Sequence, residues 1–133
     1  MPTNQATIHT MQICDSIYGD AHHGDNKPNA FRHALWNILI ARRAFKVLKT
    51  NEKAIRWSEK ITTLHETLMP NPPLEREMDL HNNMMGRKYF IELQDASEEK
   101  IIDFLKLKLE EAVQIKTVEE TENLKDFLVY IEV

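Results

Sequence analysis

Histidine, carboxylate and carboxamide side chains recur at three separate places in the chain. In chain order they are His33, His65, Glu66, Asp79, His81, Asn82 and Asn83. Neutral imidazole and carboxylate are the natural ligands of Zn²⁺ and similar divalent ions, and the same groups act as general acids and bases. Because a catalytic metal centre uses about three protein ligands and leaves one position open, we predict a divalent metal site. Zn²⁺ is the favoured ion, and no other cofactor is expected.

The predicted ligands are His33 and His65, completed by one residue from the third place. Asp79 and His81 are two positions apart, so on a regular helix they point about 200° away from each other. Both can face one site only if Asp79 lies at or before the start of its helix, and Asp is a favoured N-cap residue. We therefore expect His81 to point toward the other two histidines, and Asp79 to cap the helix or orient a neighbour. Asp79 is the ligand that replaces His81 if this expectation fails.

The spacing of these residues is less specific than a His-Glu-x-x-His motif, because no two candidate ligands stand four positions apart on one helix. A histidine on an apolar helical face is also common as a hydrogen-bonded core residue. Several buried polar groups are costly, however, unless they satisfy one another in a single network. The combination therefore favours a functional site over a set of separate core histidines.

The longest helical pattern runs from about residue 29 to residue 49 and carries His33 near its start. Its apolar residues form two stripes on nearly opposite sides, the first made of Ala34, Ile38, Ala41 and Phe45 and the second of Trp36, Ile40, Ala44 and Val47. A helix that is apolar on two sides is usually buried between neighbours. This segment is therefore predicted to be the central helix of the fold.

Four further helical segments are predicted around it. The first two cover about residues 3–18 and 52–67, the third begins between Leu74 and Asp79 and runs to about Leu93, and the last starts at a capping serine at position 97. The Gly, Asp, Asn and Pro residues at 19–28 predict a loop, and Asn29 is the predicted N-cap of the central helix. The prolines within 69–73 are predicted to end the third helix. The β-prone residues 127–133 read as an arm packed across the helices. We predict an all-α fold: one domain, residues 1–133, with about five helices around helix 29–49 and a short extended C-terminal arm.

Individual positions within these segments carry further expectations. His65 follows the apolar stripe of its helix and is predicted to face the core, with Glu66 at the edge of that stripe. His22 and His23 lie in the predicted loop, where they read as solvated residues or, alternatively, as part of the mouth of a site. Gly86 within a helix is less stable than alanine by roughly 1 kcal/mol, which indicates close approach of another backbone or of a ligand.

Composition excludes several classes of protein. A length of 133 residues is typical of one domain, and the net charge of −4 argues against a nucleic-acid partner. Cys14, the only cysteine, stands among apolar residues and reads as a buried structural thiol. The N-terminal residues lack the features of a cleavable signal peptide, and no apolar run reaches membrane-spanning length. The expected location is the cytoplasm, or export without a cleavable signal.

Three motifs resemble those of an uncharacterised bacterial domain family. They are Phe31-Arg32-His33-Ala34-x-Trp36, His65-Glu66, and Met78-Asp79-Leu80-His81-Asn82-Asn83-x-x-Gly86-Arg87. The resemblance covers about residues 25–90, and the last motif is its most specific part. That family recurs in secreted and toxin-like proteins and has no settled activity. The resemblance therefore implies a functional site, an effector role in bacteria and a hydrolytic reaction.

The predicted function is a small metal-dependent hydrolase of phosphoesters or lipids, in which the metal activates water. Glu66 is its general base, and Arg32 or Arg87 clamps an anionic group of the substrate. The other predicted substrate-binding residues are Trp36, Asn82 and Asn83. Two alternatives remain open. One is metal-free acid–base catalysis by a histidine and a carboxylate, and the other is a non-enzymatic binding or immunity-type protein whose polar cluster sets the helix register. The oligomeric state is not determined by these patterns.

Overall fold

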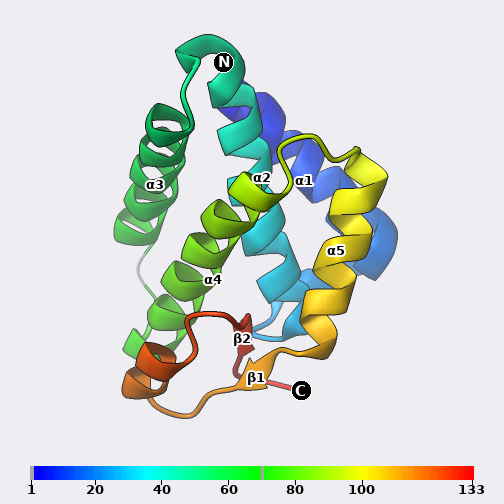
Figure 1. Ribbon diagram of the computed structural model, residues 1–133. Coiled ribbons are helices and arrows are strands. Elements are labelled where there is room, and N and C mark those ends of the chain that lie inside the picture. Colours follow the sequence, from blue (N-terminus) through cyan, green and yellow to red (C-terminus); the bar gives the residue numbers. More distant parts are fainter. Residues whose placement is uncertain (1, 70) are drawn as a thin grey trace.

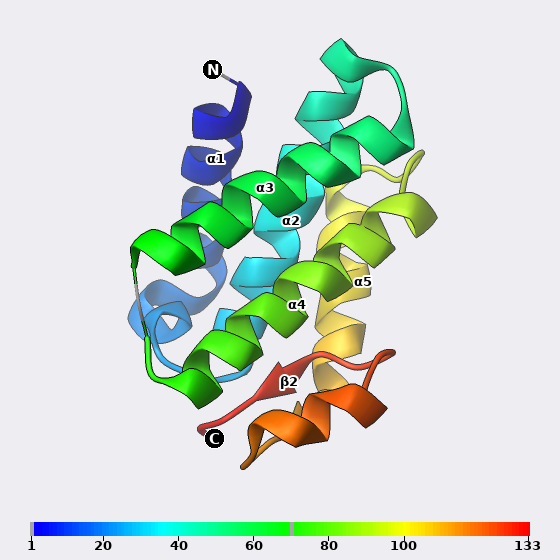
Figure 2. The same cartoon turned by 90° about the vertical axis from the view of Figure 1, so that its left-hand side faces the viewer.

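Helix α2 occupies the middle of the structure and contacts each of the other long helices. The computed structural model describes residues 2–69 and 71–133. Its long helices are α1 (Pro2–Tyr18), α2 (Lys27–Leu48), α3 (Asn51–Leu68), α4 (Pro73–Glu92) and α5 (Glu98–Glu110). α3 and α4 lie on one side of α2, and α1 and α5 contact it elsewhere (Figures 1 and 2). The all-α architecture around a central helix is thus confirmed.

The central helix begins two residues earlier than predicted. Asn26 is its N-cap, and the Asn26 side chain accepts a hydrogen bond from the backbone N–H of Asn29 at 3.1 Å. Pro28 lies in the first turn, where its missing N–H has no helical partner to lose. Asn29 was expected to be the cap but is buried inside the helix. The helix ends at Lys49, whose left-handed φ of 71° closes the last turn.

Helix α4 also begins earlier than its sequence pattern required. Its first residue is Pro73, so Asp79 lies well inside the helix and does not cap it. The proline fits there because the first turn of a helix needs no N–H donor from it. Asp79 and His81 consequently point to different sides of α4. The predicted serine cap of α5 is confirmed, because Ser97 accepts a hydrogen bond from the N–H of Lys100 at 3.2 Å.

Gly86 marks the closest contact between α2 and α4. A Cβ atom built on Gly86 would lie 2.5 Å from the carbonyl oxygen of Ala34 and 2.9 Å from its Cα. Only hydrogen at this position lets the two backbones come so near, and Ala34 supplies the smallest possible side chain opposite it. The close approach predicted from an isolated helical glycine is therefore confirmed, with a backbone as the neighbour.

The C-terminal arm crosses the base of the helices and is held by α4. It contains β1 (Val113–Gln114), the short 3₁₀-helix η2 (Val118–Asn123) and β2 (Val129–Tyr130). The two strands pair in parallel, with Val113 opposite Val129. The carboxamide of Asn82 makes two hydrogen bonds to Val129 of the arm, donating to its carbonyl at 2.8 Å and accepting from its N–H at 2.9 Å. Asn82 therefore anchors the arm to α4.

The segment before α2 is more ordered than a loop. Residues Gly19–His23 form the 3₁₀-helix η1, which begins at Gly19 with a left-handed φ of 59°. This geometry buries His22 completely, so the expectation that it is solvated is wrong. Cys14, on the preceding helix, is also fully buried as predicted, and burial raises the pKa of its thiol to about 12.

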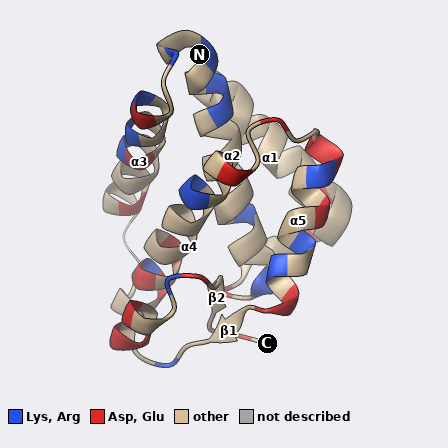
Figure 3. Cartoon of the chain, viewed as in Figure 1, with Lys and Arg blue, Asp and Glu red and all other residues tan. Residues whose placement is uncertain are grey.

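Among the described residues, Glu66 and Asp79 are the Asp, Glu, Lys and Arg side chains that are buried. Basic and acidic residues both occur along α3, and acidic residues gather on η2 at the base of the molecule (Figure 3). Over residues 2–69 and 71–133, no helix combines the length and the apolar character that a bilayer crossing requires.

The contact at Gly86 generates a stability prediction. Gly86→Ala is expected to lower the free energy of unfolding by about 1–3 kcal/mol, because the new methyl group must push α2 and α4 apart. This loss is expected even though alanine is favoured over glycine inside helices by roughly 1 kcal/mol. Urea unfolding followed by circular dichroism measures it.

Gly19→Ala is the matched control, because a Cβ there meets no atom within 4 Å and only the left-handed φ is unfavourable. Its expected loss is about 1 kcal/mol. A Gly86→Ala variant as stable as the wild type would show that the two helices are free to separate.

Candidate functional site

Three buried side chains from three helices converge at one point. His33 comes from α2, Glu66 from α3 and Asp79 from α4, and each is 6% exposed or less. One ligand atom from each residue lies within 4.8 Å of the other two. The Nε2 atom of His33 is 3.2 Å from Oδ1 of Asp79. This group of His33, Glu66 and Asp79, called the buried triad below, could hold a metal ion.

The His33 ring is oriented by Asn83, which lies one turn before Gly86 on α4. Nδ1 of His33 is 3.0 Å from the side-chain oxygen of Asn83. A carboxamide oxygen only accepts hydrogen bonds, so Nδ1 carries the ring proton and Nε2 keeps a free lone pair. Burial, with Arg32 as a smaller cause, lowers the pKa of His33 to about 3. At neutral pH this histidine is therefore uncharged, and its Nε2 lone pair lies near both Asp79 and Arg32.

A network of buried polar groups around Asn37 fixes the three helices relative to one another. The Asn37 carboxamide donates to Oδ1 of Asn83 at 2.8 Å, and its own oxygen accepts from the hydroxyls of Ser58 at 2.9 Å and Thr62 at 3.2 Å. Arg87 donates to the same oxygen at 3.1 Å. Such a network rigidifies a core only when its members are satisfied. Asn37 thus ties α2 to both α3 and α4 beside the buried triad.

The two carboxyl groups of the buried triad are poorly satisfied. Among the described residues, Oε1 of Glu66 and Oδ1 of Asp79 are buried with no hydrogen-bond partner. Burial raises the pKa of Glu66, and burial together with the neighbouring Glu66 raises the pKa of Asp79 to about 8. Like charges this close cannot both ionise without compensation. Either a shared proton or a bound cation must neutralise the pair.

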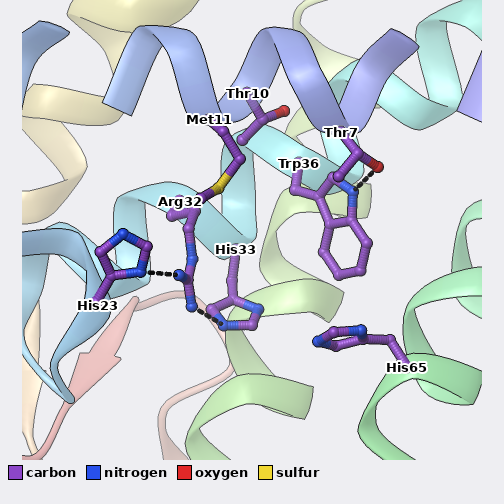
Figure 4. Close-up of a pocket in the computed structure, with 8 residues that line it drawn as sticks. All are labelled: Thr7, Thr10, Met11, His23, Arg32, His33, Trp36 and His65. Atoms are coloured by element: carbon purple, nitrogen blue, oxygen red, sulfur yellow. Dashed lines mark hydrogen bonds between the residues drawn. The ribbon is translucent and has the colours of Figure 1, made fainter. Parts of the chain in front are cut away.

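A pocket of about 280 Å³ adjoins the buried triad at His33 (Figure 4). It is lined by Thr7, Thr10, Met11, His23, Arg32, His33, Trp36 and His65. Arg32 lies between two imidazoles and donates to Nδ1 of His23 and to Nε2 of His33, each at 3.3 Å. Trp36 is held from the other side by a 2.9 Å hydrogen bond from its indole N–H to the Thr7 hydroxyl. The pocket combines one guanidinium with aromatic walls and is large enough for part of a small molecule.

His65 does not face the core as predicted. It is exposed at the pocket, with its ring 5.3 Å from that of Trp36, whereas its neighbour Glu66 is buried. The buried face of α3 consists of Ala54, Ser58, Thr62 and Glu66. Most of these residues are polar, so a search for an apolar stripe selects His65 in place of Glu66, about a quarter-turn away from the buried face.

His81 also lies elsewhere than expected. Its Nε2–H donates to the carbonyl of Phe127 at 2.7 Å, so this ring contacts the C-terminal arm and is not part of the buried triad. The expectation that His81 joins His33 and His65 is corrected: Asp79 supplies the α4 member. The physical reason is the early start of α4, which turns residues 79 and 81 to different sides.

The remaining predicted residues divide between the pocket and the interior. Arg32 and Trp36 line the pocket, and Asn83 orients His33. Asn82 instead bonds the arm, and Arg87 is bound within the Asn37 network and lies 3.7 Å from Glu59. These two side chains therefore stabilise the fold and do not reach the pocket.

Several residues of the site carried no clear signal in the sequence. The walls formed by Thr7, Thr10 and Met11 come from α1, which reaches the pocket only through its packing on α2. Asn37 was detectable in principle, because it lies four positions after His33 and is the one polar residue in the stretch 34–41. That spacing places both side chains on one face of α2.

Comparison with known proteins gives one match. The model of the family described as a domain of unknown function (DUF6973) matches residues 1–113. No curated protein and no solved structure matches the chain. Since the match covers most of its length, the chain belongs to this family.

The buried carboxyl of Asp79 should make the metal-free protein less stable as pH rises. Its pKa is about 8 in the folded chain against an ordinary 3.8, so the folded state keeps a proton that the unfolded state has lost. The effect is absent below the ordinary pKa and grows up to the raised one, with a slope approaching about 1.4 kcal/mol per pH unit. The difference in unfolding free energy between Asp79→Asn and the wild type is therefore expected to shift in favour of the variant as the pH rises from about 5 to about 7.5.

Urea unfolding in the presence of a chelator, at both pH values, measures this gain. The exposed Asp103→Asn on α5 is the matched control for the loss of a carboxylate. If the advantage of Asp79→Asn is the same at both pH values, Asp79 does not hold a proton in the folded chain.

Proposed function

We propose that this member of the DUF6973 family is a metal-dependent hydrolase of phosphoesters or lipid esters. One observation carries the proposal: the buried triad brings two unpartnered carboxylate oxygens together with the Nε2 lone pair of His33, which Arg32 contacts, at one point beside a pocket. Buried polar atoms without partners are unfavourable unless something absent from the protein chain satisfies them. A divalent cation satisfies both carboxylate oxygens and takes the imidazole lone pair as its third ligand.

The donor set narrows the choice of ion. One imidazole and two carboxylates suit borderline to hard divalent ions such as Zn²⁺, Mn²⁺ or Fe²⁺, with Zn²⁺ favoured. When bound, such an ion lowers the pKa of a coordinated water and polarises a phosphoryl or carbonyl oxygen. A histidine ligand must present an unprotonated nitrogen to the ion. In His33 this nitrogen is Nε2, because Asn83 accepts the proton of Nδ1 in a hydrogen bond. Three protein ligands leave the open position that catalysis needs.

The lining of the pocket supports the class of substrate. Arg32 is the cationic side chain among its walls, and a guanidinium matches the geometry of phosphate or carboxylate oxygens. Trp36 and Met11 provide apolar walls for the rest of the molecule. His65 lies at the pocket, where its ring is available to exchange a proton with a leaving group. Arg32 must leave Nε2 of His33 when an ion binds there, and an anionic substrate gives it a new partner.

One observation favours a metal-free mechanism as the second candidate. Arg32 already places positive charge 3.3 Å from Nε2 of His33, and Glu66 and Asp79 are close enough to share a proton. In this case the carboxyl pair acts as general acid and base without an ion. A non-enzymatic binding or immunity-type protein is the third candidate, in which the Asn37 network serves only to fix the helices. The bacterial effector role belongs to the proposal and rests on the motif resemblance.

Metal content separates these candidates. Untagged wild-type protein is expected to retain nearly one divalent ion per chain, measured by mass spectrometry of the elements. His33→Ala, Glu66→Gln and Asp79→Asn should each lose the ion. Each should also lose at least about a hundredfold in hydrolysis of a chromogenic phosphodiester or a short-chain phospholipid. His81→Asn is the matched control, since this histidine contacts the arm and should keep both metal and activity.

Arg32→Met tests the anion clamp separately. It should retain the ion and raise KM for anionic substrates, because it removes the guanidinium but not a ligand. If wild-type protein stripped of metal still hydrolyses the substrate, and Glu66→Gln loses that activity completely, the result would favour the metal-free mechanism. Absence of both metal and hydrolysis in the wild type would leave the binding protein as the remaining candidate.

A further inference from the structure

A second group of metal-binding side chains lies on the other side of Arg32. It consists of Asp15 at the end of α1 and of His22 and His23 in η1, and one ligand atom from each lies within 4.8 Å of the others. The rings of the two histidines lie with their centres 4.0 Å apart and their planes at 38° to each other. Asp15 and His23 are exposed, whereas His22 is fully buried. The group therefore lies at the surface with one member anchored in the core.

The bonding of His22 leaves one of its nitrogens unused. Nε2 is 2.7 Å from Oδ1 of Asp15, and because a carboxylate only accepts, Nε2 carries the ring proton. Nδ1 then keeps a bare lone pair, and it is buried without a hydrogen-bond partner among the residues that the structure describes. A histidine that donates one N–H to a carboxylate and keeps its other nitrogen free has the arrangement typical of a metal ligand.

We propose that His22, through Nδ1, and His23 bind a second divalent transition-metal ion, with Asp15 orienting the His22 ring through Nε2–H. Two imidazoles form a softer donor set than the buried triad, with its single imidazole and two carboxylates. Imidazole-rich sites favour Zn²⁺, Ni²⁺ and Cu²⁺ over Mg²⁺ or Mn²⁺. Both groups suit Zn²⁺, and the second group favours Ni²⁺ and Cu²⁺ more strongly than the buried triad does.

Arg32 connects this second group to the pocket. Its guanidinium donates to Nδ1 of His23 and to Nε2 of His33, so it bridges one histidine from each metal-binding group (Figure 4). An ion at either group competes with Arg32 for an imidazole lone pair. Binding at the second group is thus expected to release Arg32 toward the pocket. The existence of this site does not depend on the proposed hydrolysis, since ion binding is its only requirement.

Removing the buried triad isolates the second site. In untagged protein carrying Glu66→Gln and Asp79→Asn, titration with Ni²⁺ alone, followed by calorimetry, should show one equivalent bound per chain. Adding His23→Gln or, separately, Asp15→Asn should weaken that binding at least about tenfold. Both positions are exposed, so the fold should survive, and circular dichroism checks this.

His9→Gln in the same background is the matched control. His9 is also paired with a carboxylate, at 2.5 Å from Glu98, but it belongs to neither metal-binding group. Its loss should leave Ni²⁺ binding unchanged. The proposal is overturned if the background protein binds no Ni²⁺, or if His23→Gln and Asp15→Asn bind it as tightly as His9→Gln does.

Wild-type stoichiometry separates this inference from the proposed function. Two ions per chain support both sites. A single ion that disappears with Glu66→Gln contradicts the second site and leaves the hydrolase proposal standing. A single ion that disappears with Asp15→Asn supports the second site and contradicts the proposed metal-dependent hydrolase.

Discussion

The contact between α2 and α4 at Ala34 and Gly86 determines where the site can form. Because Gly86 has no Cβ, the two backbones approach to a distance that any other residue would prevent. Asn83 lies one turn away on α4, and at this separation its carboxamide reaches His33. That hydrogen bond selects the ring tautomer and leaves the lone pair on Nε2, where Arg32 donates to it. A wider helix spacing would remove the restraint on His33, and with it the orientation of its ring.

Two kinds of buried polar group lie next to each other in this core, and they behave differently. Around Asn37 the carboxamide oxygen has several donors, so the network stabilises the packing of three helices. The carboxyls of Glu66 and Asp79 have unpartnered oxygens and raised pKa values. The Asn37 carboxamide thus holds the scaffold together, whereas the carboxyl pair beside it leaves two oxygens unpartnered among the described residues.

The motif at residues 78–87 on α4 presents some of its side chains to the site and others to the C-terminal arm, because successive residues of a helix point to different sides. Asp79 and Asn83 stand four positions apart on one side and belong to the site, whereas His81 and Asn82 bond the C-terminal arm. The arm lies mostly beyond the 1–113 region that the family model matches. A residue of this motif can thus act through the fold, and its closeness in sequence to a residue of the buried triad does not establish a shared role.

The sequence by itself determined the helical architecture, the central position of α2, the buried thiol, the cap of α5 and the close approach at Gly86. These features follow from local periodicity, capping chemistry and the absence of a side chain, which are all read within one segment. Only the tertiary structure decided which side of α3 is buried, because that face is mostly polar and its residues are satisfied by partners on other helices. It also decided that Asp79 and not His81 joins His33, because the choice depends on where α4 begins and on what the arm covers. Long-range partners compensate buried polar groups, and no pattern within a single segment contains them.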